Sequence, residues 1–178
     1  MEEFLLTFLN LGCTLLIILL IVYWLLSPLI TTPFLVSSNK DILKLFELSK
    51  LSKKDAVIDL GSGDGRIVLA ASRVAKYAVG IEHNPFLTFF SRFMAIISAN
   101  GEVKFKNKNY WNEQLSEYDV VFLYLMPKDL VDLKKKFERE LSPGARIVSN
   151  KFQIKGWKPK KKEIIGKKAY YLYEFGSH

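Results

Sequence analysis

A glycine-rich run is the part of this sequence best suited to chemistry. Residues 57–66 read Val-Ile-Asp-Leu-Gly-Ser-Gly-Asp-Gly-Arg, with glycine at three alternate positions. Glycine lets the backbone approach a ligand that a side chain would block. The helix expected after this run points its free N–H groups at such a ligand. We therefore predict a cofactor-binding loop made of Gly61, Ser62, Gly63, Asp64 and Gly65.

Two details separate this loop from those of nicotinamide- and flavin-binding folds. In the dinucleotide fingerprint, the third glycine comes five residues after the first and lets helix and strand pack closely. Arg66 holds that position here, and the third glycine is Gly65. In addition, Asp59 precedes Gly61 by two residues, where a carboxylate can hold the amino group of a cofactor. The loop is therefore expected to bind a cofactor of another kind.

Glu82 is the second candidate cofactor ligand. It ends a predicted strand, 77–82, and lies 21 residues after Gly61. In Rossmann-type sites, an acidic side chain at this place accepts hydrogen bonds from both ribose hydroxyls. The alternative is an ordinary surface glutamate. Asn84 is expected to cap the next helix rather than to bind a ligand.

Strand and helix patterns alternate along the rest of the chain. Such alternation with short loops predicts an α/β fold with a parallel sheet covered on both faces. An antiparallel hairpin that turns near Gly166 completes a mostly parallel, seven-stranded Rossmann-like sheet. The expected strands are 56–60, 77–82, 103–107, 119–125 and 145–152, and the expected helices are 41–51, 66–75, 85–100 and 130–140.

The N-terminal segment predicts a transmembrane helix. Residues 4–26 carry no charge and would span about 34 Å as a helix, against about 30 Å for a bilayer core. Tyr23 and Trp24 suit the membrane interface, and Pro28 is expected to end the helix. A cleaved signal peptide is disfavoured by the acidic start, and a buried core helix or re-entrant segment would be shorter.

Charge favours a cytoplasmic or mitochondrial matrix location for the folded domain. Only Glu2 and Glu3 are charged before the apolar segment, whereas five lysines lie at 40, 44, 50, 53 and 54. Residues 40–178 carry a net charge of +10, which would attract anionic lipid, nucleic acid or an acidic protein. Beside a membrane anchor, lipid is the simplest partner. Cys13 is the only cysteine, so the domain has no disulfide and no Cys/His metal set.

Several of these stretches together resemble one enzyme family. The resemblance begins with DLGSGDGR (59–66), followed by VGIEHNP (79–85) and SR (91–92). These stretches are similar to the membrane-anchored lysine methyltransferases that modify the ATP synthase c subunit and the adenine nucleotide translocase, and to their shorter prokaryotic relatives. The resemblance spans nearly the whole chain. Its further matches are TPF (32–34), LSPGARIVS (141–149), Phe152 and GWKP (156–159).

The resemblance implies a class I methyltransferase that uses S-adenosylmethionine (SAM). It divides the chain into an anchor (1–29), a linker with a pre-cofactor helix (30–54) and a methyltransferase domain (55–178). It also implies that Thr32 and Pro33 join the cofactor site.

After the third strand, class I enzymes often place an aspartate near the adenine, whereas this chain has Asn109, Tyr110 and Trp111. Asparagine keeps an acceptor oxygen, so all three stay candidates for adenine contact. Trp111 packs either on the adenine or in the core.

The substrate side is expected at the end of the fourth strand. Tyr124, Phe152 and Trp157 are candidate aromatic walls of a lysine channel, with core packing as the alternative for each. Leu123 stands where methyltransferases that act on the amino groups of nucleic acids place Asp or Asn, which disfavours nucleic acid as a substrate.

The predicted reaction is SAM-dependent N-methylation of a lysine in a membrane or membrane-associated protein. Because SAM supplies the reactivity, the protein needs to supply alignment and a desolvated pocket, without a metal. An apolar channel beside a sulfonium lowers the lysine pKa from about 10.4. The alternatives are methylation of a small molecule or lipid, and a non-catalytic SAM-binding assembly or regulatory protein.

Overall fold

The computed structural model describes residues 1–30 and 37–176, and they form two separate units. The first contains α1 (Glu2–Ile30), in which the stretch Glu3–Tyr23 has a mean hydropathy of 2.7 and no buried residue. By length and composition this helix can cross a membrane. The prediction that Pro28 ends the helix was wrong, because α1 continues to Ile30. A proline this close to the helix end removes a hydrogen bond only from the last turn.

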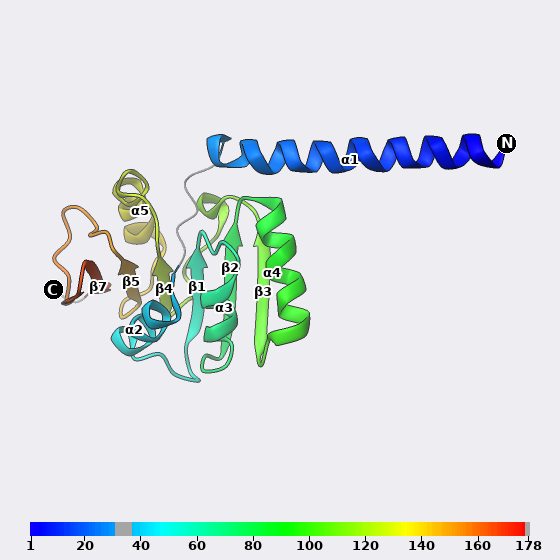
Figure 1. Cartoon of the computed structure of the whole chain (residues 1–178). Helices are drawn as coiled ribbons and strands as arrows, with labels where there is room; N and C mark the ends of the chain where they lie inside the picture. Colours follow the sequence, from blue (N-terminus) through cyan, green and yellow to red (C-terminus); the bar gives the residue numbers. More distant parts are fainter. Residues whose placement is uncertain (31–36, 177–178) are drawn as a thin grey trace. The chain divides into compact units, whose positions relative to one another are not determined.

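The second unit is built on a seven-stranded sheet in the order β3-β2-β1-β4-β5-β7-β6 (Figure 1). Strands β1 to β5 pair in parallel, and β7 pairs antiparallel with both β5 and β6, as predicted. The strands are β1 (Ala56–Leu60), β2 (Tyr77–Glu82), β3 (Glu102–Asn107), β4 (Val120–Leu123), β5 (Arg146–Asn150), β6 (Lys161–Ile165) and β7 (Lys168–Glu174). The helices are α2 (Asn39–Ser49), α3 (Arg66–Ala71), α4 (Pro85–Ser98), the short 3₁₀ helix η1 (Tyr110–Asn112) and α5 (Pro127–Glu140).

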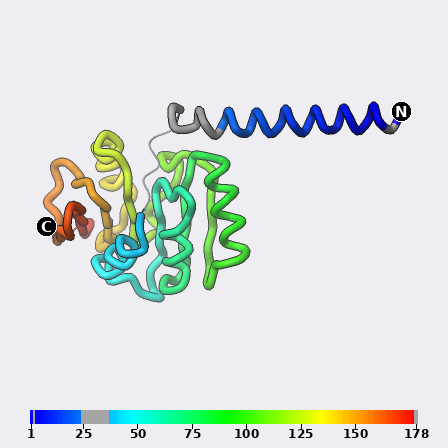
Figure 2. Tube along the Cα trace, in the orientation of Figure 1, coloured from blue at the N-terminus to red at the C-terminus, as the bar shows by residue number. Residues whose placement is uncertain are grey.

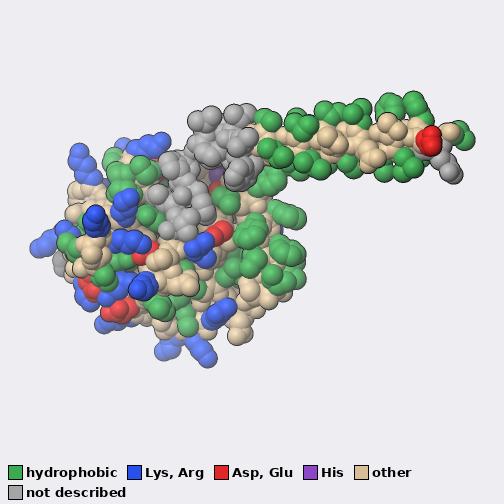
Figure 3. All heavy atoms as spheres, viewed as in Figure 1, with side chains coloured by type: hydrophobic (Ala, Val, Ile, Leu, Met, Phe, Trp, Pro, Cys, Tyr) green, Lys and Arg blue, Asp and Glu red, His purple; other side chains and the backbone are tan. Residues whose placement is uncertain are grey.

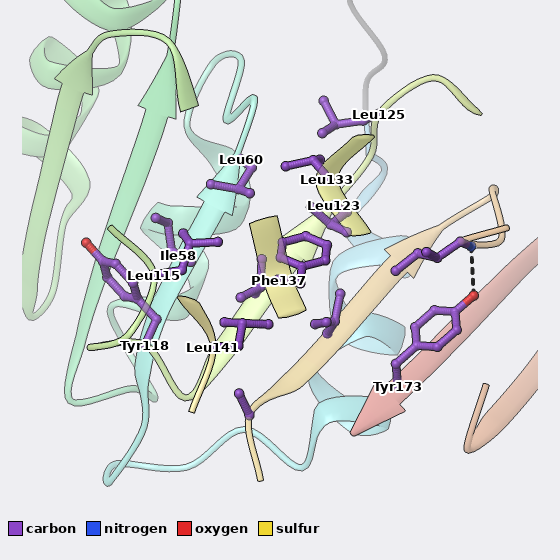
Figure 4. Close-up of a cluster of buried hydrophobic side chains, with 14 of the residues drawn as sticks. Ile58, Leu60, Leu115, Tyr118, Leu123, Leu125, Leu133, Phe137, Leu141 and Tyr173 are labelled. Atoms are coloured by element: carbon purple, nitrogen blue, oxygen red, sulfur yellow. Dashed lines mark hydrogen bonds between the residues drawn. The ribbon is translucent and has the colours of Figure 1, made fainter. Parts of the chain in front are cut away.

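The two faces of the sheet carry separate hydrophobic cores. Side chains alternate along a strand, so Val57 packs with α2 and α3, whereas Ile58 and Leu60 pack on the opposite face with α5. Figure 4 shows this second core, in which Leu133 and Phe137 of α5 lie over β1 and β4. The predicted helix 66–75 is shorter than expected, because the chain makes turns after Ala71.

Helix α2 packs against β5 and β7, which lie far from it in the sequence (Figures 1 and 2). The Ser38 hydroxyl caps this helix by accepting a hydrogen bond from the Asp41 N–H. In turn, the Asp41 carboxylate accepts a hydrogen bond from the Ser38 N–H at 2.7 Å. Asp41 is 1% exposed and also accepts hydrogen bonds from Lys168 and Tyr170 of β7. Burial alone would raise the pKa of Asp41, but these hydrogen bonds lower it to about 2. The segment before β1 is thereby fixed to the antiparallel end of the sheet.

Candidate cofactor and substrate site

The glycine-rich loop lies where β1 ends. Gly61, Gly63 and Gly65 have φ values of 80°, 56° and 80°, in the left-handed region that favours glycine. The N–H groups of Gly61 and Ser62 donate to the carbonyl of Ile81 at 2.9 and 3.0 Å, which fixes the loop to β2. A Cβ at Gly65 would lie 2.6 Å from the Phe105 ring. Sterics therefore require glycine at this place.

Glu82 lies beside this loop, as the strand register predicts. Leu60 pairs with Ile81, so the ends of β1 and β2 meet at one edge. One Glu82 carboxylate oxygen accepts from the Gly63 N–H at 3.0 Å, and the other accepts from the Asn84 N–H at 2.8 Å. Glu82 is therefore part of the site rather than an unattached surface residue. Asn84 caps α4 through hydrogen bonds from the backbone N–H groups of Phe86 and Leu87, as expected.

Asp59 brings a second carboxylate to the same edge. It is 2% exposed, and its pKa is raised to about 8, first by burial and then by the charges of Glu82 and Asp64. Asp64 is paired with Arg66, whose Nε donates to it at 2.9 Å. A cationic ligand at this edge would favour the ionised form of Asp59.

The segment Asn109-Tyr110-Trp111 forms η1, which follows β3. The side-chain oxygen of Asn109 accepts a hydrogen bond from the Trp111 N–H at 3.0 Å, so it caps this turn. The rings of Tyr110 and Trp111 contact each other with centroids 5.4 Å apart. Trp111 is 38% exposed, which disfavours core packing for this residue. Contact of the three residues with adenine stays a prediction.

Tyr124 and Phe152 follow neighbouring strands at the same edge of the sheet. Tyr124 comes directly after β4, and Phe152 comes two residues after β5; both are partly exposed. The Lys151 ammonium lies 5.1 Å from the centre of the Phe152 ring. In the parallel register of β4 and β5, Leu123 pairs with Ser149, and Phe152 packs against the hydrophobic core that contains Leu123 and Ile147. A shared channel of Tyr124 and Phe152 stays a prediction.

Trp157, the third candidate wall of the lysine channel, packs against other aromatic rings. Its ring packs against Phe137, Tyr173 and Phe175, with centroids 6.2, 5.9 and 6.2 Å away. Tyr173 pairs with Ile147, near the start of β5 rather than its end. Trp157 thus fills the core beside α5, which is the alternative considered for it.

Asn150 is a candidate that the sequence analysis missed. This last residue of β5 is 1% exposed, and its side-chain nitrogen donates to the Ser37 hydroxyl at 3.4 Å. Its side-chain oxygen has no hydrogen-bond partner among the described residues, and neither has the buried Ser62 hydroxyl. Unpaired buried polar atoms are costly, so their presence at this edge favours a ligand that bonds to them. The signal in the sequence was a polar pair, Ser149-Asn150, that ends an apolar strand.

Two predicted site residues, Thr32 and Pro33, lie outside the described residues. Across residues 1–30 and 37–176, no group of three His, Cys, Asp or Glu side chains is placed to hold a metal ion.

The sheet order with its terminal hairpin and the glycine loop beside two carboxylates define a class I methyltransferase. The chain belongs to the family described as the ANTKMT methyltransferase domain, whose sequence model matches residues 59–161. SAM is its cofactor, and the residues fit this ligand: its ammonium suits the buried Asp59 carboxyl, and its ribose hydroxyls suit the Glu82 carboxylate.

Related proteins cover most of this domain. A protein-lysine N-methyltransferase of Saccharolobus islandicus is 36% identical over 157 residues, which are 82% of this chain and 95% of that protein. A human lysine N-methyltransferase, named for the c protein of ATP synthase, is 34% identical over 149 residues, which are 79% of this chain and 64% of that protein. The chain therefore spans nearly all of the archaeal relative and just under two thirds of the human one.

A solved structure has the same fold with a bound product. The RNA methyltransferase from Salinibacter ruber, in complex with S-adenosyl-L-homocysteine, superimposes with a TM-score of 0.76 at 31% identity. The match covers 79% of this chain and 93% of that chain. S-adenosylhomocysteine is what remains of SAM after methyl transfer, in accord with the cofactor assigned above.

Proposed function

We propose that this chain N-methylates lysine side chains of a protein in or at the membrane that α1 crosses. The observation that carries the proposal is the 36% identity to a protein-lysine N-methyltransferase along nearly its whole length. A mouse relative, 34% identical over 129 residues, is an adenine nucleotide translocase lysine N-methyltransferase. The apolar stretch Glu3–Tyr23 would hold the enzyme at the membrane where such a target lies.

The proposed cofactor contacts follow from the positions of Asp59 and Glu82, whose carboxyl groups lie at the same edge of the sheet. Asp59 and the loop 61–65 would take the amino-acid end of SAM, and Glu82 would accept hydrogen bonds from both ribose hydroxyls. The segment 109–111 would border the adenine. Thr32 and Pro33 are proposed to complete the site from the segment that joins α1 to the domain.

Methyl transfer requires alignment and a neutral lysine. SAM supplies an electrophilic methyl group, and the lysine nitrogen must attack it in line. Tyr124 and Phe152 would exclude water around the lysine side chain, and loss of water lowers the lysine pKa. The free side-chain oxygen of Asn150 would accept a hydrogen bond from the amine and orient it. The protein thus promotes the reaction by orientation and desolvation.

The test is to identify the methylated residue. The full-length chain is incubated with isotopically labelled SAM and with membranes from cells that lack the gene. Mass spectrometry should find the label on lysine, and Tyr124→Ala should reduce the rate while leaving SAM affinity unchanged. RNA, lipid extract and small-molecule fractions are assayed in parallel, because the structural neighbour at 31% identity is an RNA methyltransferase. Label in one of those fractions without lysine labelling would overturn the proposal.

Glu82 gives a direct test of the ribose assignment. Glu82→Ala should weaken S-adenosylhomocysteine binding by about 2–3 kcal/mol, or about 30- to 150-fold, through the loss of hydrogen bonds to a charged acceptor. Glu102→Ala removes an exposed glutamate of β3 and serves as the control. Calorimetry measures both variants, and a loss below about threefold for Glu82→Ala would contradict the assignment.

The contact of Glu82 with Gly63 requires a second measurement, since the variant also loosens the loop. Binding of a 2′-deoxy analogue separates the two effects. If Glu82 binds the ribose, the variant and the analogue each lose the same interaction, so their losses do not add. Additive losses would assign Glu82 to the loop alone.

Asp59 makes cofactor affinity depend on pH. Its pKa of about 8 in the free protein means that it is largely protonated at pH 7, whereas a cationic ligand favours the ionised form. Affinity should therefore fall by up to about tenfold for each pH unit below 8 and level off above 8. Calorimetry from pH 6 to 8.5 checks this, and Asp59→Asn should bind weakly without the pH dependence. A flat profile for the unmodified chain would refute the expectation.

A further inference from the structure

Helix α4 turns its large apolar side chains to the outside of the domain. Only Thr88 and Ser91 of this helix are buried. Six large apolar side chains of α4 are exposed, and five of them lie further along the helix, exposed by 71, 48, 52, 84 and 63%: Phe89, Phe90, Phe93, Ile96 and Ile97. We call these five residues the α4 apolar face. Figure 3 shows hydrophobic side chains gathered on this side of the domain, where Figure 1 places α4.

The glycine loop explains why small residues face inward. The Ser91 hydroxyl donates to the Gly63 carbonyl at 3.1 Å, and a Cβ at Gly65 would lie 2.9 Å from the Ser91 Cβ. The Thr88 hydroxyl donates to the Asn84 carbonyl at 3.0 Å. Because α4 crosses this close to the cofactor loop, large side chains have no room on its inner face. The outward direction of the α4 apolar face is therefore set by the cofactor site.

The spacing of the five residues makes a continuous stripe. Positions 89, 93 and 96 follow the helical period, and positions 90 and 97 lie beside them. Single exposed apolar residues are common on protein surfaces, whereas a contiguous apolar patch marks an interaction site. The α4 apolar face is therefore expected to be an interaction surface.

We infer that the α4 apolar face contacts the lipid bilayer in which α1 is anchored. Six residues, 31–36, join Ile30 to Ser37, and a chain of that length reaches at most about 25 Å. Ser37 is bound at the cofactor edge, since its carbonyl accepts from Arg66 at 2.9 Å and its hydroxyl accepts from Asn150. Helix α4 begins at this same edge, three residues after Glu82. The edge at which the chain enters the domain therefore also carries the start of the apolar stripe.

Charge and residue type fit a lipid surface. Residues 40–178 carry a net charge of +10, which attracts anionic headgroups. Phenylalanine and isoleucine on an amphipathic helix insert about 5–10 Å into the boundary between headgroups and acyl chains. Contact of α4 with the bilayer would hold the cofactor edge of the domain near the membrane surface, where a lysine of a membrane protein leaves the bilayer. This inference rests on the membrane anchoring in the proposed function, so its test must report on α1 separately.

The experiment places one fluorescent label at a time on the full-length chain. The chain is reconstituted, one copy per nanodisc, in bilayers with anionic lipid and a spin-labelled lipid that quenches fluorescence. Native Cys13 lies in α1, so its label reports on the anchor. Cys13→Ser with Ile96→Cys reports on α4. Cys13→Ser with Ile164→Cys is the matched control, because Ile164 is an isoleucine of β6 that is 65% exposed.

The expected result is quenching at positions 13 and 96, several-fold stronger at 96 than at 164. Quenching at 13 with equal, weak quenching at 96 and 164 would overturn the inference and leave the anchor in place. Quenching at 96 without quenching at 13 would support lipid contact by α4 and refute the anchor. A second set of discs is prepared with two copies each. Shielding of position 96 from water in these discs but not in the one-copy discs would overturn the inference, because a second copy would then cover the α4 apolar face.

Discussion

Replacing Gly63 with arginine is expected to abolish measurable SAM binding while the domain stays folded. Gly63 has a φ of 56°, which costs a residue with a side chain about 1 kcal/mol. That strain is too small to unfold a domain, but Gly63 is buried, so an arginine side chain must also displace neighbouring groups beside the loop. Arginine would occupy space beside the loop and bring positive charge to a site whose carboxylates, Asp59 and Glu82, favour a cation.

A second glycine provides the matched control. Gly166 turns the β6–β7 hairpin with a φ of 60°, and a Cβ there would meet no atom within 4 Å. Gly166→Arg therefore imposes the same backbone strain away from the cofactor loop. Calorimetry should show normal S-adenosylhomocysteine binding for Gly166→Arg and none for Gly63→Arg, and thermal melting should show that both variants are folded. Binding by Gly63→Arg within about tenfold of normal would mean that the loop does not hold the cofactor.

Deleting residues 1–30 is expected to leave SAM affinity unchanged and to reduce methylation of the membrane target by about 100-fold or more. The apolar stretch of α1 contributes nothing to the buried core, so its removal should not open the domain. A tether that confines the enzyme to the membrane raises its effective concentration toward membrane targets to about the millimolar range. The deletion removes this gain without touching the loop, Asp59 or Glu82.

Two measurements separate tethering from chemistry. A soluble lysine substrate should be methylated at equal rates by the full chain and the shortened one. Replacing residues 1–30 with an unrelated single-span helix should restore methylation of the membrane target. Loss of SAM binding on deletion would show that the segment belongs to the domain, and full retention of target methylation would show that the anchor does not select the substrate.

The sequence alone predicted the two strands and the loop that position the site. Buried parallel strands appear as apolar runs, so 56–60 and 77–82 were predicted to the residue. Because neighbouring parallel strands end at the same edge, the positions of Gly61 and Glu82 along the chain also predicted that they meet. Local signals were equally informative for Asn84, since a helix cap depends on residues within one turn.

Only the tertiary structure decided which side chains share space. Trp157 was a candidate for the substrate channel, but contacts with Phe137 and Tyr173, from distant segments, place it in the core. The unpaired oxygen of Asn150 became visible only when its surroundings were known. Helix α4 is apolar around most of its circumference, so periodicity could not choose its inner face. The space beside the glycine loop made that choice, because it admits Ser91 and excludes a phenylalanine.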